Sequence, residues 1–122
     1  MATKQAVVPV SYAAGADLRT KQFRAVKMSG NRAVTVVSGA NDNMIGVLQN
    51  TPNEGQAAEI DISGITKWEA GATITAGQRV KKHTDGTCLP VGVGVAYDGV
   101  AVRGAASAEY AEVLLVLGGY GV

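Results

Sequence analysis

The sequence is poor in the residues that usually build cross-links and large binding pockets. Among its 122 residues there are one cysteine, one histidine, three prolines and 5% aromatic residues, whereas glycine occurs 16 times. One cysteine cannot form an internal disulfide, which fits synthesis in a reducing compartment. Few aromatic residues and many glycines favour tight turns and close backbone packing over large aromatic pockets.

The chain also lacks a strong charge and a long apolar run. Eleven Lys and Arg against ten Asp and Glu give a formal net charge of +1, which implies no strong attraction to nucleic acid or to an anionic membrane. The longest apolar runs are far shorter than about 20 residues and contain Gly or Pro. The N-terminal AVVPV is too short for the core of a signal peptide. We therefore expect a soluble protein made in the cytoplasm.

The residues needed for catalysis or for metal binding are scarce. His83 lies in VKKHTDG, a predicted turn with two lysines, and we interpret it as a solvated turn residue. Cys88 and His83 together cannot fill a tetrahedral zinc site, and we interpret Cys88 as a small buried hydrophobe. The glycine-rich GVGVAYDG lacks the spacing of a phosphate-binding loop. The sequence therefore predicts no enzyme activity, no metal site and no cofactor.

Short strands separated by turns dominate the pattern. Residues 57–63 (AAEIDIS) alternate apolar and polar side chains, as in a half-buried strand. Residues 33–37 and 44–48 are short, apolar or β-branched, and bounded by clusters of Gly and Asn that close turns. This pattern predicts an all-β fold, a small β-barrel-like or sandwich-like domain.

The segment 104–117 (GAASAEYAEVLLVL) is open to two interpretations. Its Ala, Glu and Leu content is compatible with a helix. Its last part, EVLLVL (residues 112–117), is apolar on both faces, as in a strand between a core and a second layer or subunit. The comparison with the first half of the chain, described next, favours a strand over residues 109–117.

Two parts of the chain are similar at an offset of 53 residues, with small length changes in loops. The matched pairs are Gly46 with Gly99, Val47 with Val100, Ala58 with Ala111, Glu59 with Glu112, Ile60 with Val113, and Ile62 with Leu115. The copies span about residues 15–64 and 71–117, within one β domain at residues 15–122. We expect the two similar halves to complete a single core that neither copy can bury alone, although a chance match is the alternative.

Residues 1–14 lie outside both predicted copies and form an extended N-terminal arm. The arm carries Val7, Val8, Val10 and Tyr12 without a partner in the repeat. Such an arm is either frayed or docked as an extra strand on the sheet edge of a neighbouring molecule.

Two further features have open interpretations. Five cations with no acid between them follow the arm, at Arg19, Lys21, Arg24, Lys27 and Arg32. A solvated surface, a protein contact and nucleic-acid binding are the alternatives, and the last is weakened because Phe23 alone is available for base stacking. Trp68, the single tryptophan, either plugs the barrel or anchors an interface.

The chain resembles the capsid decoration, or cement, proteins of tailed bacteriophages over about residues 15–118. The similarity is carried by IGVLQN, by AAEIDISGITKWEAGATITAGQRVK and by the terminal EVLLVL. The resemblance implies a small β-barrel-like protein without enzyme activity on the outer capsid surface of a virion. It further implies a homotrimer at or near threefold positions that binds the major capsid protein and stabilises the shell against internal DNA pressure.

Two sets of residues are candidates for these contacts. We predict that Val7, Val8, Val10 and Tyr12 lie along the major capsid protein. Trp68, Leu115 and Leu117 are the candidates for the contact between protomers. We expect no direct contact with nucleic acid or membrane, and synthesis in the host cytoplasm. The alternative function is a head-fibre or receptor-binding module that recognises host glycans.

Overall fold

The computed structural model describes residues 2–39, 41–92 and 94–120. In these ranges the chain forms strands and no helix, which confirms the predicted all-β class. The described residues form nine strands: β1 (Gln5–Ala14), β2 (Ala25–Gly30), β3 (Ala33–Val36), β4 (Met44–Leu48), β5 (Ala57–Glu69), β6 (Arg79–Lys82), β7 (Cys88–Val91), β8 (Ala96–Arg103) and β9 (Tyr110–Tyr120).

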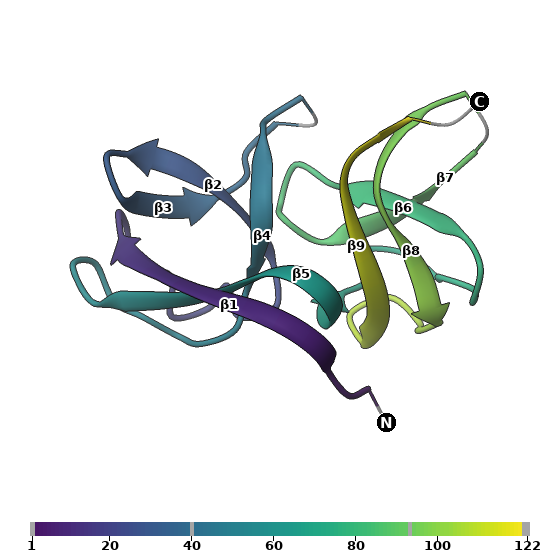
Figure 1. The fold of residues 1–122 in the computed structure, drawn as a ribbon, viewed down its shortest axis with the longest axis horizontal. Helices are drawn as coiled ribbons and strands as arrows, with labels where there is room; N and C mark the ends of the chain where they lie inside the picture. The colour runs from purple at the N-terminus through teal and green to yellow at the C-terminus, as the bar shows by residue number, and fades with distance from the viewer. Residues whose placement is uncertain (1, 40, 93, 121–122) are drawn as a thin grey trace.

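Two lobes lie side by side, and β5 runs from one lobe into the other (Figure 1). All nine strands found in the described residues belong to one sheet with the order β1-β3-β2-β4-β5-β9-β8-β6-β7. In the first lobe β1 also pairs with β5, so that β1, β3, β2, β4 and β5 form a closed ring. This closed ring of strands confirms the expected β-barrel-like fold.

The two lobes have the same strand pairing. We define the first unit as residues 9–63 and the second unit as residues 65–117. In the first unit β2 pairs with β3 and β4, and β4 pairs with β5; in the second, β6 pairs with β7 and β8, and β8 pairs with β9. The registers also match: Val26↔Gly46 corresponds to Val80↔Gly99, and Leu48↔Ile60 corresponds to Ala101↔Val113. The two halves are therefore similar in structure, as the sequence predicts.

The correspondence includes β1, which the sequence places outside both copies. Tyr12 of β1 pairs with Ala58 of β5, whereas Trp68 at the C-terminal end of β5 pairs with Ala111 of β9. The parallel contact between β1 and β3 likewise has a counterpart, a bridge between Ala70 and Cys88 that closes the ring of the second unit. β5 is therefore the last strand of the first unit and the first strand of the second. The domain boundary at residue 15 stays a prediction.

The interior consists of two clusters, which corrects the expectation of a single core. The first cluster belongs to the first unit and contains Ala14, Leu18, Val26, Val34, Leu48, Ala58 and Ile60. The second cluster surrounds Trp68 and Val80 in the second unit, and it also includes Ala25, Met44 and Val47 from the first. The first strand ring therefore encloses its own core, whereas the second core extends to residues of the first unit that pack against the second ring.

A glycine in the middle of β5 allows this strand to serve both units. Gly64 has φ +91°, and a Cβ there would overlap the carbonyl oxygen of Ala6 in β1. Before this glycine Ala58 and Ile60 are buried in the first core, and after it Trp68 is buried in the second. Because only glycine adopts such a φ without strain, Gly64 permits the close crossing of β1.

β9 confirms the strand interpretation of residues 109–117 over the helical one. Ala111, Val113 and Leu115 point into the second core, whereas Leu114 and Val116 point outward, at 42% and 37% exposure. This alternation is the two-residue period of a strand.

Candidate functional site

His83 lies in a turn and Cys88 lies in the core, as the sequence predicts. His83 is in the turn between β6 and β7, where its backbone N–H donates a hydrogen bond to the carbonyl of Thr87 at 2.7 Å. Cys88 is fully buried in the second core. Burial raises the pKa of the Cys88 thiol to about 12, because the thiolate loses its hydration. The thiol is therefore a buried hydrophobe with little reactivity.

Among the described residues, no three His, Cys, Asp or Glu side chains gather in a metal-binding group. In the same part of the chain there is no helix with the length and apolar character to cross a membrane.

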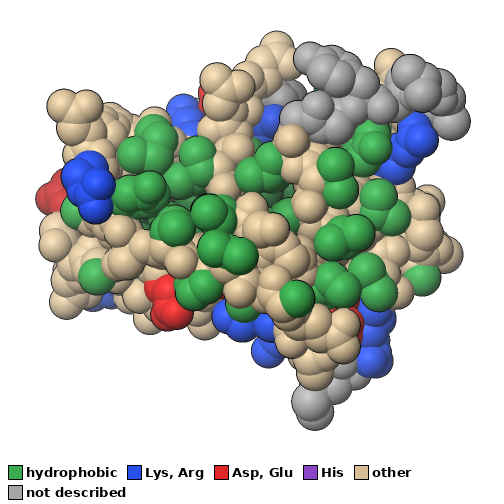
Figure 2. All heavy atoms as spheres, in the orientation of Figure 1, with side chains coloured by type: hydrophobic (Ala, Val, Ile, Leu, Met, Phe, Trp, Pro, Cys, Tyr) green, Lys and Arg blue, Asp and Glu red, His purple; other side chains and the backbone are tan. Residues whose placement is uncertain are grey.

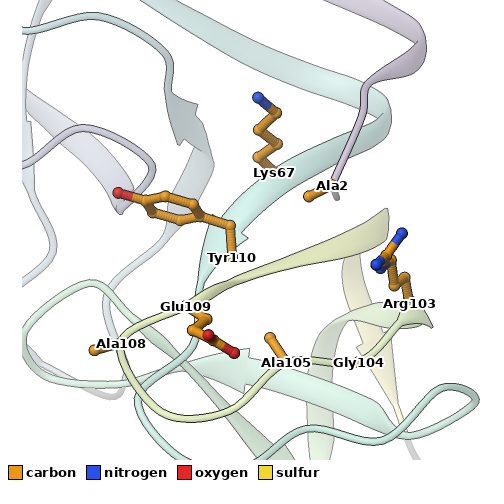
Figure 3. A pocket seen from close by; sticks show the side chains of 8 residues that line it. All are labelled: Ala2, Lys67, Arg103, Gly104, Ala105, Ala108, Glu109 and Tyr110. Carbon is orange, nitrogen blue, oxygen red and sulfur yellow. The ribbon is translucent and has the colours of Figure 1, made fainter.

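An open depression of about 480 Å³ lies where β5, β8 and the start of β9 meet (Figure 3). Lys67, Arg103 and Glu109 contribute charged groups to its lining. The Lys67 ammonium lies over the ring of Phe23 at 5.5 Å, and Phe23 meets Tyr110 edge to face at 4.8 Å. These contacts hold the lining residues to one another, so the depression is built from packing interactions between the units.

Four of the five cations in the basic run have separate partners. Arg19 pairs with Asp17 at 2.8 Å, Arg24 with Glu69 at 3.4 Å and Lys27 with Asp42 at 3.0 Å, and Arg32 lies over the ring of Tyr12 at 5.5 Å. The sequence interpretation missed these acids because they lie outside the run. The run is therefore divided among local contacts and does not form one basic stripe.

The four candidate capsid-binding residues all lie on β1, but they differ in exposure. Val8 is 48% exposed, Val7 is half-buried, and Val10 and Tyr12 pack in part against the first core. The arm pairs along its length with β5 of its own chain, so its docking is intramolecular. The side chain best placed to reach another protein from this set is Val8.

The three candidates for the contact between protomers are divided by the structure. Trp68 is 0% exposed and donates a hydrogen bond from Nε1 to the carbonyl oxygen of Gly86 at 2.9 Å. Leu115 is 8% exposed and belongs to the same core. Both assignments to an interface are corrected, because neither side chain offers surface to a partner. Leu117 is 38% exposed and keeps its place as a candidate.

An apolar strand face lies beside Leu117, and it includes the second apolar side of the run at residues 112–117 that the sequence assigns to a second layer or subunit. We call it the outer β8–β9 face and define it by Val100, Val102, Leu114 and Val116. Val102 is 48% and Leu114 is 42% exposed. Figure 2 shows hydrophobic side chains gathered over β8 and β9 on this side of the molecule. Apolar surface grouped in this way is typical of a protein contact.

The structure thus defines a class of protein, a two-ring β protein with exposed apolar strand faces. No protein-family model matches the chain, and no curated protein is similar to it in sequence. Among solved structures, the chain is similar to the N base of the head fibre protein gp8.5 of bacteriophage phi29. The TM-score is 0.69 at 17% sequence identity, and the match covers 90% of this chain and 94% of that chain. At this identity the similarity establishes the shared fold.

Proposed function

We propose that this chain is a structural component of a bacteriophage virion that binds the outer surface of the capsid through the major capsid protein. In this role it decorates the shell as a homotrimer, near threefold positions, and stabilises it against internal DNA pressure. The observation that carries the proposal is the fold shared with the N base of a phage head fibre over nearly the full length of both chains. Because fold alone does not determine function, the proposal also needs a surface suited to the role.

The exposed apolar strand faces support a binding role. Val8 on β1 and the outer β8–β9 face present apolar side chains on sheet surfaces, where flat contacts with other proteins form. Three joined protomers would each add one modest contact with the capsid. The effective concentration of the remaining contacts is then high, so that the assembly dissociates slowly.

The experiment is co-sedimentation of the purified protein with empty capsids, comparing the native chain with Val8→Lys. We expect Val8→Lys to weaken capsid binding by roughly tenfold or more, because a charge would enter an apolar contact. Thr73→Lys is the matched control, since it adds the same charge at an exposed loop position of the second unit. Native affinity in Val8→Lys would remove β1 from the capsid contact.

Removing the whole arm is a poor test. Val10 and Tyr12 pack on the first core, and β1 closes the first strand ring through its pairing with β5. Deletion of residues 2–12 would therefore open this ring and expose its core. Loss of capsid binding in that variant would report unfolding of the first unit.

A second candidate function is a head-fibre or receptor-binding module whose β domain itself recognises host glycans. It is favoured by the name of the matched structure, which is itself the base of a head fibre. The two functions are distinguished by binding to empty capsids against binding to extracts of host surface. Binding to host surface by the chain alone would favour the second candidate, and binding to capsids alone favours decoration.

A further inference from the structure

Within the chain, the second unit covers one face of the sheet of the first unit. Ala25 and Val47, on neighbouring strands of the first unit, are fully buried in the cluster that holds Trp68 and Val80 of the second. Within the single sheet, the strands of each unit therefore have an inner face toward their own core and a back face. The back face of the first unit is closed by the second.

Three polar contacts between the units, and one within the second unit, fix this arrangement. The carbonyl oxygen of Gly86 accepts hydrogen bonds from the backbone N–H of Ala25 at 2.7 Å and from Trp68 Nε1 at 2.9 Å. Glu69 donates its backbone N–H to the carbonyl of Phe23 at 2.8 Å. The Arg24 guanidinium, which lies 3.4 Å from the Glu69 carboxylate, adds an ion pair.

A cluster of buried polar side chains, formed by Asp61, Gln49 and Thr66, completes the contact between the two units. Asp61 and Gln49 of the first unit are 0% and 9% exposed. Thr66 of the second unit donates its hydroxyl to Asp61 Oδ2 at 2.9 Å and accepts a hydrogen bond from Gln49 Nε2 at 3.0 Å. Lys4 lies 3.3 Å from the same Asp61 oxygen. Here the back face of the first unit is polar, and so is the residue that covers it.

The back face of the second unit has matching positions but no cover within the described residues. The register Val47↔Asp61 corresponds to Val100↔Leu114, and Gln49 corresponds to Val102. Leu114 and Val102 are 42% and 48% exposed. The back face of the second unit is therefore the outer β8–β9 face, apolar at the positions where its counterpart is polar and buried.

The covering surface also has a counterpart, at the free end of the first unit. Thr66 and Trp68, which cover the back face, correspond to Val10 and Tyr12 on β1. Both β1 side chains are partly exposed. On the covering side, the polar Thr66 of the second unit is matched by the apolar Val10 of the first. On the covered side, the polar Asp61 of the first unit is matched by the apolar Leu114 of the second. The two surfaces are thus complementary in chemistry.

From this correspondence we propose that the outer β8–β9 face of one molecule binds the β1 end of a second molecule of the same chain, defined by Val10, Tyr12 and Arg32. The contact joins the strand faces that correspond to those packed together within one molecule, and it differs at the turn, where Arg32 takes the place of Gly86. It joins different surfaces of the two partners, so it is head-to-tail and gives a ring when the rotation closes. This inference deepens the proposed function, which includes a homotrimer, by naming the surfaces that join the protomers.

The first test measures the solution mass of the purified chain by sedimentation equilibrium, without capsids. We expect the native chain to self-associate in the micromolar range. Leu114→Glu is expected to weaken association by roughly tenfold or more, because it places a charge in the centre of an apolar contact. Thr73→Glu, with the same charge at an exposed loop position, is expected to associate like the native chain. A native chain that stays monomeric, or a Leu114→Glu chain that associates normally, would overturn the proposal.

The second test distinguishes a head-to-tail contact from a symmetric one. Val10→Glu alters the β1 end and is expected to be monomeric; Tyr12→Glu is the replacement if the first variant shows no cooperative unfolding transition. An equal mixture of Val10→Glu and Leu114→Glu is expected to give dimers of one of each, because each variant keeps one intact surface. A mixture that stays monomeric would overturn the head-to-tail arrangement.

These measurements need no capsid, so their failure is distinct from failure of the proposed function. A monomeric chain that co-sediments with capsids would overturn the contact between copies and leave capsid binding in place. A chain that forms rings but binds no capsid would overturn capsid decoration and leave the head-to-tail contact standing.

Discussion

The two units of this protein share one strand plan but hold their aromatic side chain differently at one matched position. In the second unit this position holds Trp68, which is 0% exposed and hydrogen bonded to Gly86. In the first unit it holds Tyr12, which is half-buried and lies under the guanidinium of Arg32. Gly86 and Arg32 themselves occupy matched turns, the first buried and the second exposed. The same backbone arrangement thus buries an aromatic side chain in the second unit and leaves one accessible at the surface of the first.

This difference follows from what lies beside each unit. The turn of Gly86 is packed against Ala25 and Val36 of the first unit, where even a Cβ would meet Val36 at 2.6 Å. The matched turn at Arg32 has no unit of the same chain next to it, so a long charged side chain fits there. Position in the tandem pair, and not the local strand pattern, determines which residues become core.

The largest expected effect is the loss of Trp68. Trp68→Ala should lower the free energy of unfolding by about 3–5 kcal/mol, because it leaves a large cavity in the second core. Tyr12→Ala, at the matched position, should cost about 1–2 kcal/mol, since the ring is only partly buried. Urea unfolding followed by circular dichroism measures both. Equal losses in the two variants would contradict the proposed difference between the units.

Trp68→Phe is the control for this comparison. It keeps most of the ring volume but removes the hydrogen bond to Gly86, so we expect a loss of about 1 kcal/mol from the bond, together with a smaller packing loss.

A smaller effect is expected at two matched glycines, where the units should behave alike. A Cβ at Gly46 would overlap the carbonyl oxygen of Asp61, and one at Gly99 would meet Val113 Cγ1 at 2.5 Å. Gly46→Ala and Gly99→Ala should therefore each lower the free energy of unfolding by about 1–3 kcal/mol, as overpacking does. Thermal unfolding measures the losses. A neutral Gly99→Ala would show that β8 and β9 are packed less tightly than their counterparts.

A reciprocal pair of substitutions tests the matched turns before β5 and β9. Gly55 has φ +84°, and the matched residue is Ala108, with φ +69°. Because a Cβ is strained in this region, Gly55→Ala should destabilise the protein by about 1 kcal/mol and Ala108→Gly should stabilise it by a similar or smaller amount. A Cβ at Gly55 would meet nothing within 4 Å, so the change tests the backbone alone. Changes of the same sign would mean that the two turns differ in conformation.

Much of the strand plan could be predicted from local patterns. The alternation over residues 57–63 defines the first part of β5, and the match of Gly46 with Gly99 anticipates the registers that the two units share. The place of β1 could not be predicted in the same way. Its pairing with β5 is irregular between Gln5 and Pro9, so its apolar residues do not follow a two-residue period.

The faces of β9 were equally hidden in the sequence. The run EVLLVL is apolar at nearly every position, so periodicity gives no indication that Leu115 is core and Leu114 surface. A usable signal did exist at matched positions of the repeat. Asp61 and Gln49 in the first copy are replaced by Leu114 and Val102 in the second, and a change from polar to apolar at the same register marks a face with a different environment.

The smallest expected effect concerns the loop between β3 and β4, which has an acid that the matched loop lacks. Asp42 Oδ2 accepts hydrogen bonds from the backbone N–H groups of Ser38 and Gly39, each at 2.9 Å, and lies 3.0 Å from Lys27 Nζ. These hydrogen bonds, the one from Ser38 foremost, and the Lys27 charge lower the pKa of Asp42 from 3.8 to about 2. The matched position in the second unit is Val95.

A lowered pKa makes the charged carboxylate the stabilising form. Its contribution is therefore complete above the ordinary value of 3.8 and is lost as the pH falls through about 2. We expect the amides of Ser38 and Gly39 to lose hydrogen-exchange protection over this range, relative to their intrinsic rates, while the amide of Gly92 in the matched loop does not change. Asp42→Asn keeps a hydrogen-bond acceptor but has no titratable group. In this variant the protection of the Ser38 and Gly39 amides should therefore be independent of pH. Equal loss in both loops would indicate acid unfolding of the whole chain, because a group confined to the first unit cannot loosen the second alone.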